Sequence, residues 1–284
     1  MIEPSAPKTI LSMQSQVVGA RVGNSVAAFA MERLGVRVMQ APTTLLGRRP
    51  DHGPPGGGPI PAATLAALIE GLAADGLLAE IDAVLTGYLG VADQVAVVLD
   101  AVERIKAVNP KAVFVCDPVL GDDGKLFVSD AIADAVLNGL CPHADWLTPN
   151  AFELGLIAGR PIEGLEDART AARRVGKPVL CSSIRTALGL GNLYAAPGSE
   201  WFCETARMPR AQKGAGDLLS ALFTARRVRG DAPVVALEGA TGAVYDVIVR
   251  SLAAESEDLL LPGAQDVLAE PVTWPRARQL ELAQ

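Results

Sequence analysis

The sequence predicts an α/β fold in which a mostly parallel central sheet lies between two layers of helices. Short apolar segments typical of strands alternate along the chain with longer segments of helical periodicity. Most of the strand segments lack a polar face, which is typical of parallel strands covered by helices on both sides. Polar residues follow several of these segments directly, so we expect them to meet at one edge of the sheet, where such folds bind ligands.

The predicted strands are apolar segments only a few residues long. They lie at residues 9–13, 37–41, 83–86, 112–116, 146–148 and 178–181. Two later segments, 188–194 and 201–204, are expected to form an antiparallel pair at the edge of the sheet.

The predicted helices connect these strands. The clearest one repeats valine and isoleucine at helical spacing between Val91 and Val108. The first one stops at Gly35, because glycine is typical of the position that follows a helix. Predicted helices lie at residues 25–34, 62–74, 91–108, 129–140, 151–158 and 166–175, and a last helical region covers 216–256 with a break near Gly230 and Asp231.

Residues 47–61 differ from the rest of the chain because they are dense in proline and glycine. Such a composition cannot continue a helix or a central strand. We expect a mobile flap loop that acts either as a lid or as a passive insertion. The chain shows no internal repeat and no linker, so we expect one domain that covers residues 1–284.

Composition excludes several classes of protein. Apolar residues make up 50% and charged residues 20% of the 284 positions, which is typical of an ordered globular protein. The formal net charge of −7 lacks the basic surplus of nucleic-acid-binding domains. No uninterrupted apolar run reaches the ~18 residues of a membrane-spanning helix. The N-terminus lacks a signal-peptide core, and the four cysteines form no C-x-x-C pair, so we expect a cytoplasmic protein with buried thiols.

The turn Gly214–Ala215–Gly216–Asp217 precedes an apolar helical pattern. Small residues at a helix N-terminus let backbone N–H groups approach an anion, and the helix dipole favours negative charge there. Asp217 would then lie beside a bound phosphoryl group and could accept a proton from an attacking hydroxyl. Alternatively, Asp217 only complements the helix dipole and the glycines only form a turn.

A second group of polar residues follows two other strand segments. Asp117 comes directly after a buried strand, where a carboxylate could hold Mg²⁺ directly or through water. Asn150 and Glu153 have helical i, i+3 spacing, so both could face the same point. The same spacing predicts a capping box, in which Asn150 caps the helix and Glu153 bonds back. The two roles can coexist.

These motifs together resemble the pyridoxal kinase branch of the ribokinase-like superfamily. The order and spacing of the motifs match that family over residues 9 to 253. The matching segments are TILSMQSQVV (9–18), GNS (23–25) with the helix up to Gly35, LTGY (85–88), VCDPVLG (115–121), TPN (148–150) with Glu153, and GAGD (214–217). The resemblance implies a three-layer α/β/α sandwich and ATP-dependent phosphorylation of the 5′-hydroxymethyl group of pyridoxal.

The resemblance also implies roles for individual residues. Asp217 would be the base, and the amides of Gly214, Ala215 and Gly216 would hold the γ-phosphate. Asp117 and Glu153 would organise Mg²⁺, with K⁺ as a further candidate cation. The implied nucleotide-side residues are Asp117, Thr148, Asn150 and Ser182, and the implied substrate-side residues are Ser15, Tyr88, Pro50 and Asp51. The implied partners are ATP, a vitamin B6 vitamer and a second copy of the chain, without nucleic acid or membrane.

The chain departs from the family pattern at three places. Gln16 stands where the family usually has histidine. In the flap, Pro50 stands where a substrate-contacting threonine is expected, and the aromatic residue of the flap is missing. Cys181 stands where threonine or lysine is common on the nucleotide side. The phosphate-handling residues are therefore better matched than those that would select pyridoxal.

Two alternatives stay open. The first is a kinase for hydroxymethylpyrimidine or another small molecule. The hydroxymethylpyrimidine branch also uses a G-x-G-D turn, but the segment around Ser15 and the LTGY motif favour the pyridoxal branch. The altered flap motivates the second alternative, which is a member that binds a vitamer without catalysis.

Overall fold

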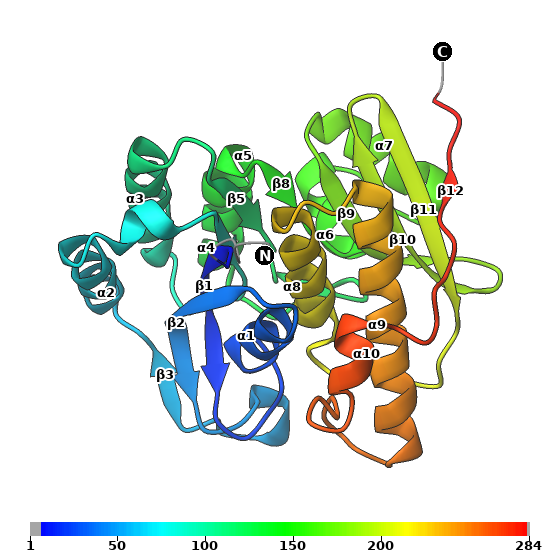
Figure 1. Cartoon of the computed structure of the whole chain (residues 1–284), viewed down its shortest axis with the longest axis horizontal. Helices are drawn as coiled ribbons and strands as arrows, with labels where there is room; N and C mark the ends of the chain where they lie inside the picture. The colour runs from blue at the N-terminus through cyan, green and yellow to red at the C-terminus, as the bar shows by residue number, and fades with distance from the viewer. Residues whose placement is uncertain (1–6, 283–284) are drawn as a thin grey trace, which may run out of the picture.

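A ten-stranded sheet forms the middle layer of the computed structural model, which describes residues 7–282 (Figure 1). The order of its strands is β12-β11-β10-β9-β8-β5-β4-β1-β2-β3. The six strands from β9 to β2 run parallel, whereas β3 and β10 to β12 pair antiparallel at the two edges. The strands of this sheet are β1 (Thr9–Val17), β2 (Arg37–Leu46), β3 (Gly57–Pro59), β4 (Ala83–Thr86), β5 (Val113–Cys116), β8 (Trp146–Leu147), β9 (Val179–Arg185), β10 (Gly189–Ala196), β11 (Ser199–Ala206) and β12 (Arg278–Gln279).

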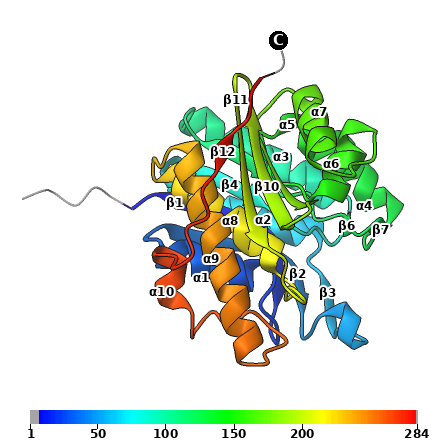
Figure 2. The ribbon, with the colours of Figure 1, turned by 90° about the vertical axis from the view of Figure 1, so that its right-hand side faces the viewer.

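Helices cover both faces of the sheet (Figures 1 and 2). The α-helices are α1 (Asn24–Arg33), α2 (Ala62–Ala74), α3 (Gln94–Val108), α4 (Asp130–Ala135), α5 (Cys141–His143), α6 (Ala151–Ala158), α7 (Leu165–Val175), α8 (Ala215–Val228), α9 (Pro233–Ala253) and α10 (Gln265–Ala269). Short 3₁₀ turns are η1 (Pro50–His52) and η2 (Leu77–Glu80), and η3 (Val136–Leu140) is a π-helical segment.

Two hydrophobic cores show that the strands are buried on both faces. Val84 of β4 belongs to the core under α2, α3, α6 and α7, whereas its neighbour Leu85 belongs to the core under α1, α8 and α9. Phe114 and Val115 of β5 divide in the same way, because successive side chains of a strand point to opposite faces. The predicted three-layer α/β/α sandwich is therefore confirmed.

Most predicted elements are present, with three differences. β1 and β2 are longer than predicted, because their last residues pair with each other beyond the apolar segments. The predicted helix 129–140 is divided into α4 and the π-helical η3. The sequence did not predict α10, β12 or the small hairpin of β6 (Gly121–Asp122) and β7 (Lys125–Leu126), because each is too short to show a periodic pattern.

The flap segment 47–61 is more ordered than a loop. It contains η1 and the edge strand β3, which pairs antiparallel with the end of β2. Proline is tolerated in β3 because only one side of an edge strand is hydrogen-bonded. Gly57 has a φ of +82°, and a Cβ atom there would lie 2.1 Å from the carbonyl oxygen of Leu45. Glycine is therefore required for the hairpin to close.

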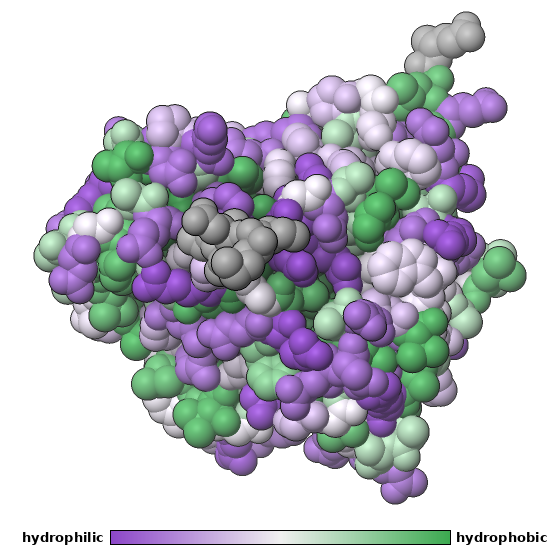
Figure 3. Space-filling view, viewed as in Figure 1, coloured by the Kyte–Doolittle hydropathy of each residue, from purple (hydrophilic) through white to green (hydrophobic). Residues whose placement is uncertain are grey.

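The surface on the side shown in Figure 3 is a mixture of polar and apolar residues. Large apolar residues such as Val18, Leu188 and Val272 are exposed at separate places in the sequence, and isolated ones are normal on soluble surfaces. Among residues 7–282, no helix combines the length and the apolar character needed to cross a bilayer.

Candidate active site

The turn at Gly214, at the N-terminus of α8, packs against the loop between β1 and α1. Gly214 is the residue before α8 and has a φ of +90°, a left-handed conformation that favours glycine. A Cβ atom at this position would lie 2.2 Å from the carbonyl oxygen of Arg21. Gly216 has open space around its Cβ position. The turn therefore needs glycine at Gly214 and leaves room beside the first amides of the helix.

Asp217 lies in the first turn of α8 and contacts the same loop. Its Oδ2 accepts a hydrogen bond of 2.8 Å from the backbone N–H of Gly23. Burial raises the pKa of Asp217 above its ordinary value, and the bond from Gly23 opposes part of that rise. A Cβ atom at Gly23 would lie 2.2 Å from the carbonyl oxygen of Ser15. The structure thus brings Ser15, Gly23 and Asp217 together, although they are far apart in sequence.

Ser220 connects this helix to the end of β5. Its hydroxyl donates a 2.6 Å hydrogen bond to Oδ2 of Asp117 and lies 2.9 Å from Oγ1 of Thr148. All three side chains are buried. Because Ser220 follows Asp217 by one helical turn, a single helix contacts the Asp117 carboxylate and also carries the candidate base. Ser220 was not predicted from the sequence, since a serine within an apolar helix face does not stand out as functional.

Asn150 and Glu153 form the predicted capping box at the start of α6. Asn150 Oδ1 accepts from the Glu153 N–H at 2.9 Å, and Glu153 Oε2 accepts from the Asn150 N–H at 2.9 Å. The other oxygen of Glu153 accepts from the N–H groups of Leu120 at 2.7 Å and Gly121 at 3.3 Å. Burial raises the pKa of Glu153 to about 7, although these backbone bonds oppose the rise. Glu153 therefore has a structural role, because it holds the loop that follows Asp117 in place.

The carboxylates around Asp117 fit a cation that keeps water and phosphate ligands. The pKa of Asp117 is well above its ordinary value, because the group is buried and lies near the carboxylates of Glu153 and Asp217. Within residues 7–282, no group of three or more His, Cys, Asp or Glu side chains could enclose a metal ion. Mg²⁺ is typically held by one or two carboxylates together with substrate phosphates and water. The donor set agrees with that mode of binding and not with a closed protein cage.

Ser182 lies beside the start of α6. Its N–H donates a 3.0 Å hydrogen bond to the carbonyl of Pro149, and an isolated parallel bridge joins it to Asn150. Its neighbour Ser183 has a φ of +60°, which is uncommon for a residue other than glycine. Cys181 is fully buried, so its thiol belongs to the core. The structure therefore brings Thr148, Asn150 and Ser182 to one edge of the sheet, as predicted.

The substrate-side predictions divide into two groups. Ser15 is 6% exposed, and among the described residues its hydroxyl has no hydrogen-bond partner. Tyr88 is half-buried, its carbonyl accepts a 2.6 Å hydrogen bond from Thr43, and burial raises the pKa of its phenol. By contrast, Pro50 and Asp51 are exposed in η1, and no described hydrogen bond connects them to Ser15 or Tyr88.

Gln94 is a second residue that the sequence analysis missed. Its side chain is fully buried and donates 2.7 Å hydrogen bonds to the carbonyls of Thr43 and Ile60. Its Oε1 accepts from the N–H of Gly90 at 3.0 Å. Gln94 thus fixes both ends of the flap hairpin to the loop that contains Tyr88.

The fold and this site define the class of protein. A three-layer sandwich that places a glycine-rich helix N-terminus and several carboxylates at the carboxyl ends of parallel strands is the arrangement of the ribokinase-like small-molecule kinases, which the chain resembles. Comparison with known proteins agrees. The family model described as phosphomethylpyrimidine kinase matches residues 29–260.

Relatives and a solved structure identify the branch. Pyridoxal kinase PdxY of Pseudomonas fluorescens (strain SBW25) is 37% identical over an alignment of 284 residues, and the match covers 96% of this chain and 98% of the relative. Pyridoxal kinase PdxY of Corynebacterium diphtheriae is 36% identical over 271 residues, which cover 92% and 96%. The structure of Leishmania donovani pyridoxal kinase in complex with ADP and pyridoxamine has a TM-score of 0.91 and 27% identity, and the match covers 96% of this chain and all of that chain. The chain belongs to the pyridoxal kinase family.

Proposed function

We propose that this protein transfers the γ-phosphoryl group of ATP to the 5′-hydroxymethyl group of pyridoxal, giving pyridoxal 5′-phosphate and ADP, as expected of an enzyme of B6 salvage. The observation that carries the proposal is the position of Asp217, which lies in the first turn of α8 and contacts the loop that follows Ser15. The relatives named pyridoxal kinase support the substrate, and the Leishmania structure with ADP and pyridoxamine supports the nucleotide and the vitamer class.

Asp217 acts as the general base in this proposal. It accepts the proton of the vitamer hydroxyl while the hydroxyl oxygen forms a bond to the γ-phosphorus. The bond between that phosphorus and the bridging oxygen of ATP breaks, and ADP leaves with the electron pair. Burial raises the pKa of Asp217 above its ordinary value, so its carboxylate is a stronger base than an exposed aspartate.

The N-terminus of α8 supplies the charge stabilisation. The amides of Gly214, Ala215 and Gly216 point at the transferred phosphoryl group, and the dipole of this 14-residue helix favours the negative charge that the group carries. Phosphoryl transfer depends mainly on positioning and electrostatic stabilisation, so this small set of groups is sufficient in kind.

Asp117 and Glu153 would hold Mg²⁺ between the sheet and the nucleotide phosphates, where the ion would neutralise phosphate charge. Asp117 is better placed for direct or water-mediated contact, because both oxygens of Glu153 already accept backbone hydrogen bonds. Thr148, Asn150 and Ser182 would line the nucleotide side. Magnesium titration of the ATP-dependent rate tests this assignment, with K⁺ as a second cation to be compared.

Ser15 and Tyr88 would contact the pyridine ring, since the Ser15 hydroxyl has no hydrogen-bond partner within residues 7–282 and Tyr88 lies half-buried just after β4. The flap would close over the ring through Pro50 and Asp51. Gln16 is not free to replace the usual histidine, because its side chain donates a 2.9 Å hydrogen bond to Ser25. We therefore infer an altered preference among the three B6 vitamers.

Initial rates with pyridoxal, pyridoxine and pyridoxamine test the proposal. We expect ATP-dependent phosphorylation of at least one vitamer that exceeds the rate with hydroxymethylpyrimidine. The family model motivates that comparison, because it is described as phosphomethylpyrimidine kinase. Equal and very weak turnover of all three vitamers would contradict the B6 assignment, and binding of pyridoxal without consumption of ATP would favour a vitamer-binding protein.

The resemblance to pyridoxal kinases also motivates a homodimer and a cytoplasmic location as predictions. Light scattering of the purified protein and fractionation of the source cells would test them separately.

A further inference from the structure

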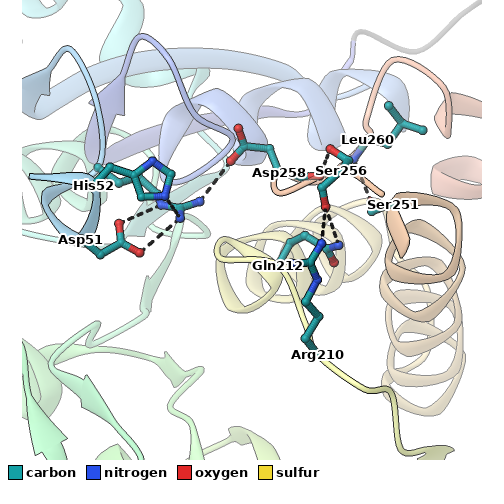
Figure 4. A network of polar contacts seen from close by, with 9 residues as sticks. Asp51, His52, Arg210, Gln212, Ser251, Ser256, Asp258 and Leu260 are labelled. Carbon is teal, nitrogen blue, oxygen red and sulfur yellow. Dashed lines mark hydrogen bonds and ion pairs between the residues drawn. The ribbon is translucent and has the colours of Figure 1, made fainter. Parts of the chain in front are cut away.

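A single loop contacts both the flap and the segment that precedes the glycine-rich turn. This loop, residues 255–260, follows α9 and is called the bridging loop here (Figure 4). Its Asp258 accepts a 3.1 Å hydrogen bond from Nη1 of Arg49 in the flap. Its Ser256 carbonyl accepts from Gln212 at 3.1 Å and from Arg210 at 3.3 Å. Gln212 is 5% exposed and precedes Gly214 by two residues.

Every nitrogen of the Arg49 guanidinium has a partner. Its Nε and Nη2 donate to the two carboxylate oxygens of Asp51 at 3.0 Å and 3.2 Å, and Nη2 also lies 2.7 Å from Nε2 of His52. Nη1 is left for Asp258, and the Arg49 side chain is only 11% exposed. Arg49 therefore binds Asp51 and His52 at the tip of the flap and connects the tip to Asp258 in the bridging loop.

The bridging loop is held rigidly against α9. The Ser256 hydroxyl donates to the carbonyl of Asp258 at 2.7 Å, which fixes the residue that meets the flap. The N–H of Leu260 donates to the hydroxyl of Ser251 at 2.9 Å, and that hydroxyl donates to the carbonyl of Val247 at 2.7 Å. The loop thus provides a fixed point that does not depend on the flap.

The flap itself has few other long-range attachments. Among residues 7–282, three residue pairs join β3 to β2, Gln94 donates a 2.7 Å hydrogen bond to the carbonyl of Ile60 at the end of the flap, and the N–H of Gly19 donates a 3.0 Å hydrogen bond to the carbonyl of Gly47 at its start. The η1 residues Pro50, Asp51 and His52 are all exposed. The tip of the flap would therefore move more freely if the contact between Arg49 and Asp258 were lost.

We propose that Asp258 is a positioning residue that fastens the flap, through Arg49, to the same loop that supports Gln212 and the phosphate-binding turn. This inference rests on the proposed kinase function. The fastened flap holds the vitamer against Asp217 and keeps water from the γ-phosphorus. In its absence water replaces the vitamer hydroxyl as the attacking group, so that ATP is hydrolysed to ADP and phosphate without transfer.

Hydrogen exchange of residues 47–61 in the full-length protein tests the fastening independently of activity. We expect Asp258→Asn, which keeps an acceptor oxygen but loses the negative charge that pairs with Arg49, to exchange faster than wild type in this segment, whereas Asp258→Glu retains the charge and most of the protection. Asp266→Asn is the matched control, because Asp266 pairs with Arg250 at 2.6 Å on the surface and no described hydrogen bond or ion pair connects it to residues 47–61. Unchanged exchange in Asp258→Asn would overturn the inference.

Kinetics of the same variants test the positioning role. In Asp258→Asn we expect the KM for the vitamer to rise roughly threefold to tenfold, as a partly exposed charged contact allows. We also expect more ATP to be hydrolysed per vitamer phosphorylated. Asp258→Ala should add little to Arg49→Ala, because both remove the same contact. Additive effects, or unchanged coupling of ATP use to transfer, would overturn the proposal, whereas a wild type without vitamer phosphorylation would refute the kinase assignment instead.

Discussion

Asp217 accepts a 2.8 Å hydrogen bond from the backbone N–H of Gly23, although 194 residues separate the two in sequence. The bond fixes the candidate base against the loop that leaves β1, the strand that carries Ser15. The same bond holds the N-terminus of α8 in a fixed position relative to β1 and the loop that follows it.

Gly214→Ala should lower kcat/KM for ATP at least tenfold. A left-handed φ costs a non-glycine residue about 1 kcal/mol, and the new Cβ would also lie 2.2 Å from the Arg21 carbonyl oxygen. Gly230→Ala is the matched control, because Gly230 also has a positive φ but has open space around its Cβ position. Steady-state kinetics and thermal unfolding separate the effects. Similar losses of activity in both variants would show that backbone strain alone accounts for the result.

Ser220→Ala should raise the KM for Mg²⁺–ATP roughly tenfold or more. The variant removes the 2.6 Å hydrogen bond to Asp117, and a hydrogen bond to a charged group contributes about 1.5–3 kcal/mol. Thr224→Val is the control, because Thr224 lies one turn further along α8 and its buried hydroxyl has no hydrogen-bond partner among residues 7–282. Nucleotide titrations measure both variants. An unchanged KM in Ser220→Ala would show that Asp117 needs no support from this helix.

The rate should fall as the pH is lowered, and the fall should occur at a higher pH than the pKa of an ordinary aspartate, which is about 3.9. Burial raises the pKa of Asp217, and the base must be deprotonated to accept a proton. The activity is therefore lost as pH falls through this raised pKa. The pH profile of kcat/KM for the vitamer measures the value in the free enzyme. A rate that stays constant down to about pH 4 would contradict the assignment.

Glu153→Gln should make the stability of the ligand-free protein less dependent on pH. The pKa of Glu153 is about 7 in the folded protein, against about 4.3 in an unfolded chain. Because the pKa is raised on folding, the contribution of Glu153 to the stability of the folded protein is fully present below the pKa of the unfolded chain and is lost as pH rises towards 7. Denaturant titrations at about pH 5 and pH 8 measure the slope. Glu103→Gln on the exposed face of α3 is the control, and equal slopes in wild type and Glu153→Gln would refute this prediction.

The sequence predicted the parts of the site that stand directly at strand ends. Asp117, Thr148 and Asn150 follow buried strands, so the parallel topology alone is enough to bring them to one edge. The capping box at Asn150 was also visible, because its spacing is local. The structure confirms these positions, and the roles of the residues in binding and catalysis stay predictions.

The residues that the sequence did not reveal act through long-range contacts. Ser220 and Gln94 lie inside helices among apolar neighbours. The partners of Ser220 are 72 or more residues away in sequence, and those of Gln94 are up to 51 residues away. Arg49 and Asp258 lie in two loops without a periodic pattern. Only the tertiary fold brings such pairs together, so no local spacing could have predicted them.

The role of Asp217 as the base is tested most directly by the effect of Asp217→Asn on transfer of the labelled γ-phosphoryl group of ATP to pyridoxal. Asparagine keeps an oxygen for the Gly23 N–H but cannot accept the proton, so we expect kcat to fall about 10²-fold to 10⁴-fold. Nucleotide binding and the unfolding temperature should change no more than in Asp93→Asn, which alters an exposed aspartate before α3. Labelled pyridoxal 5′-phosphate from the wild type, and almost none from Asp217→Asn, is the predicted result. Equal rates of labelling by the two proteins would contradict the assignment of Asp217 as the base.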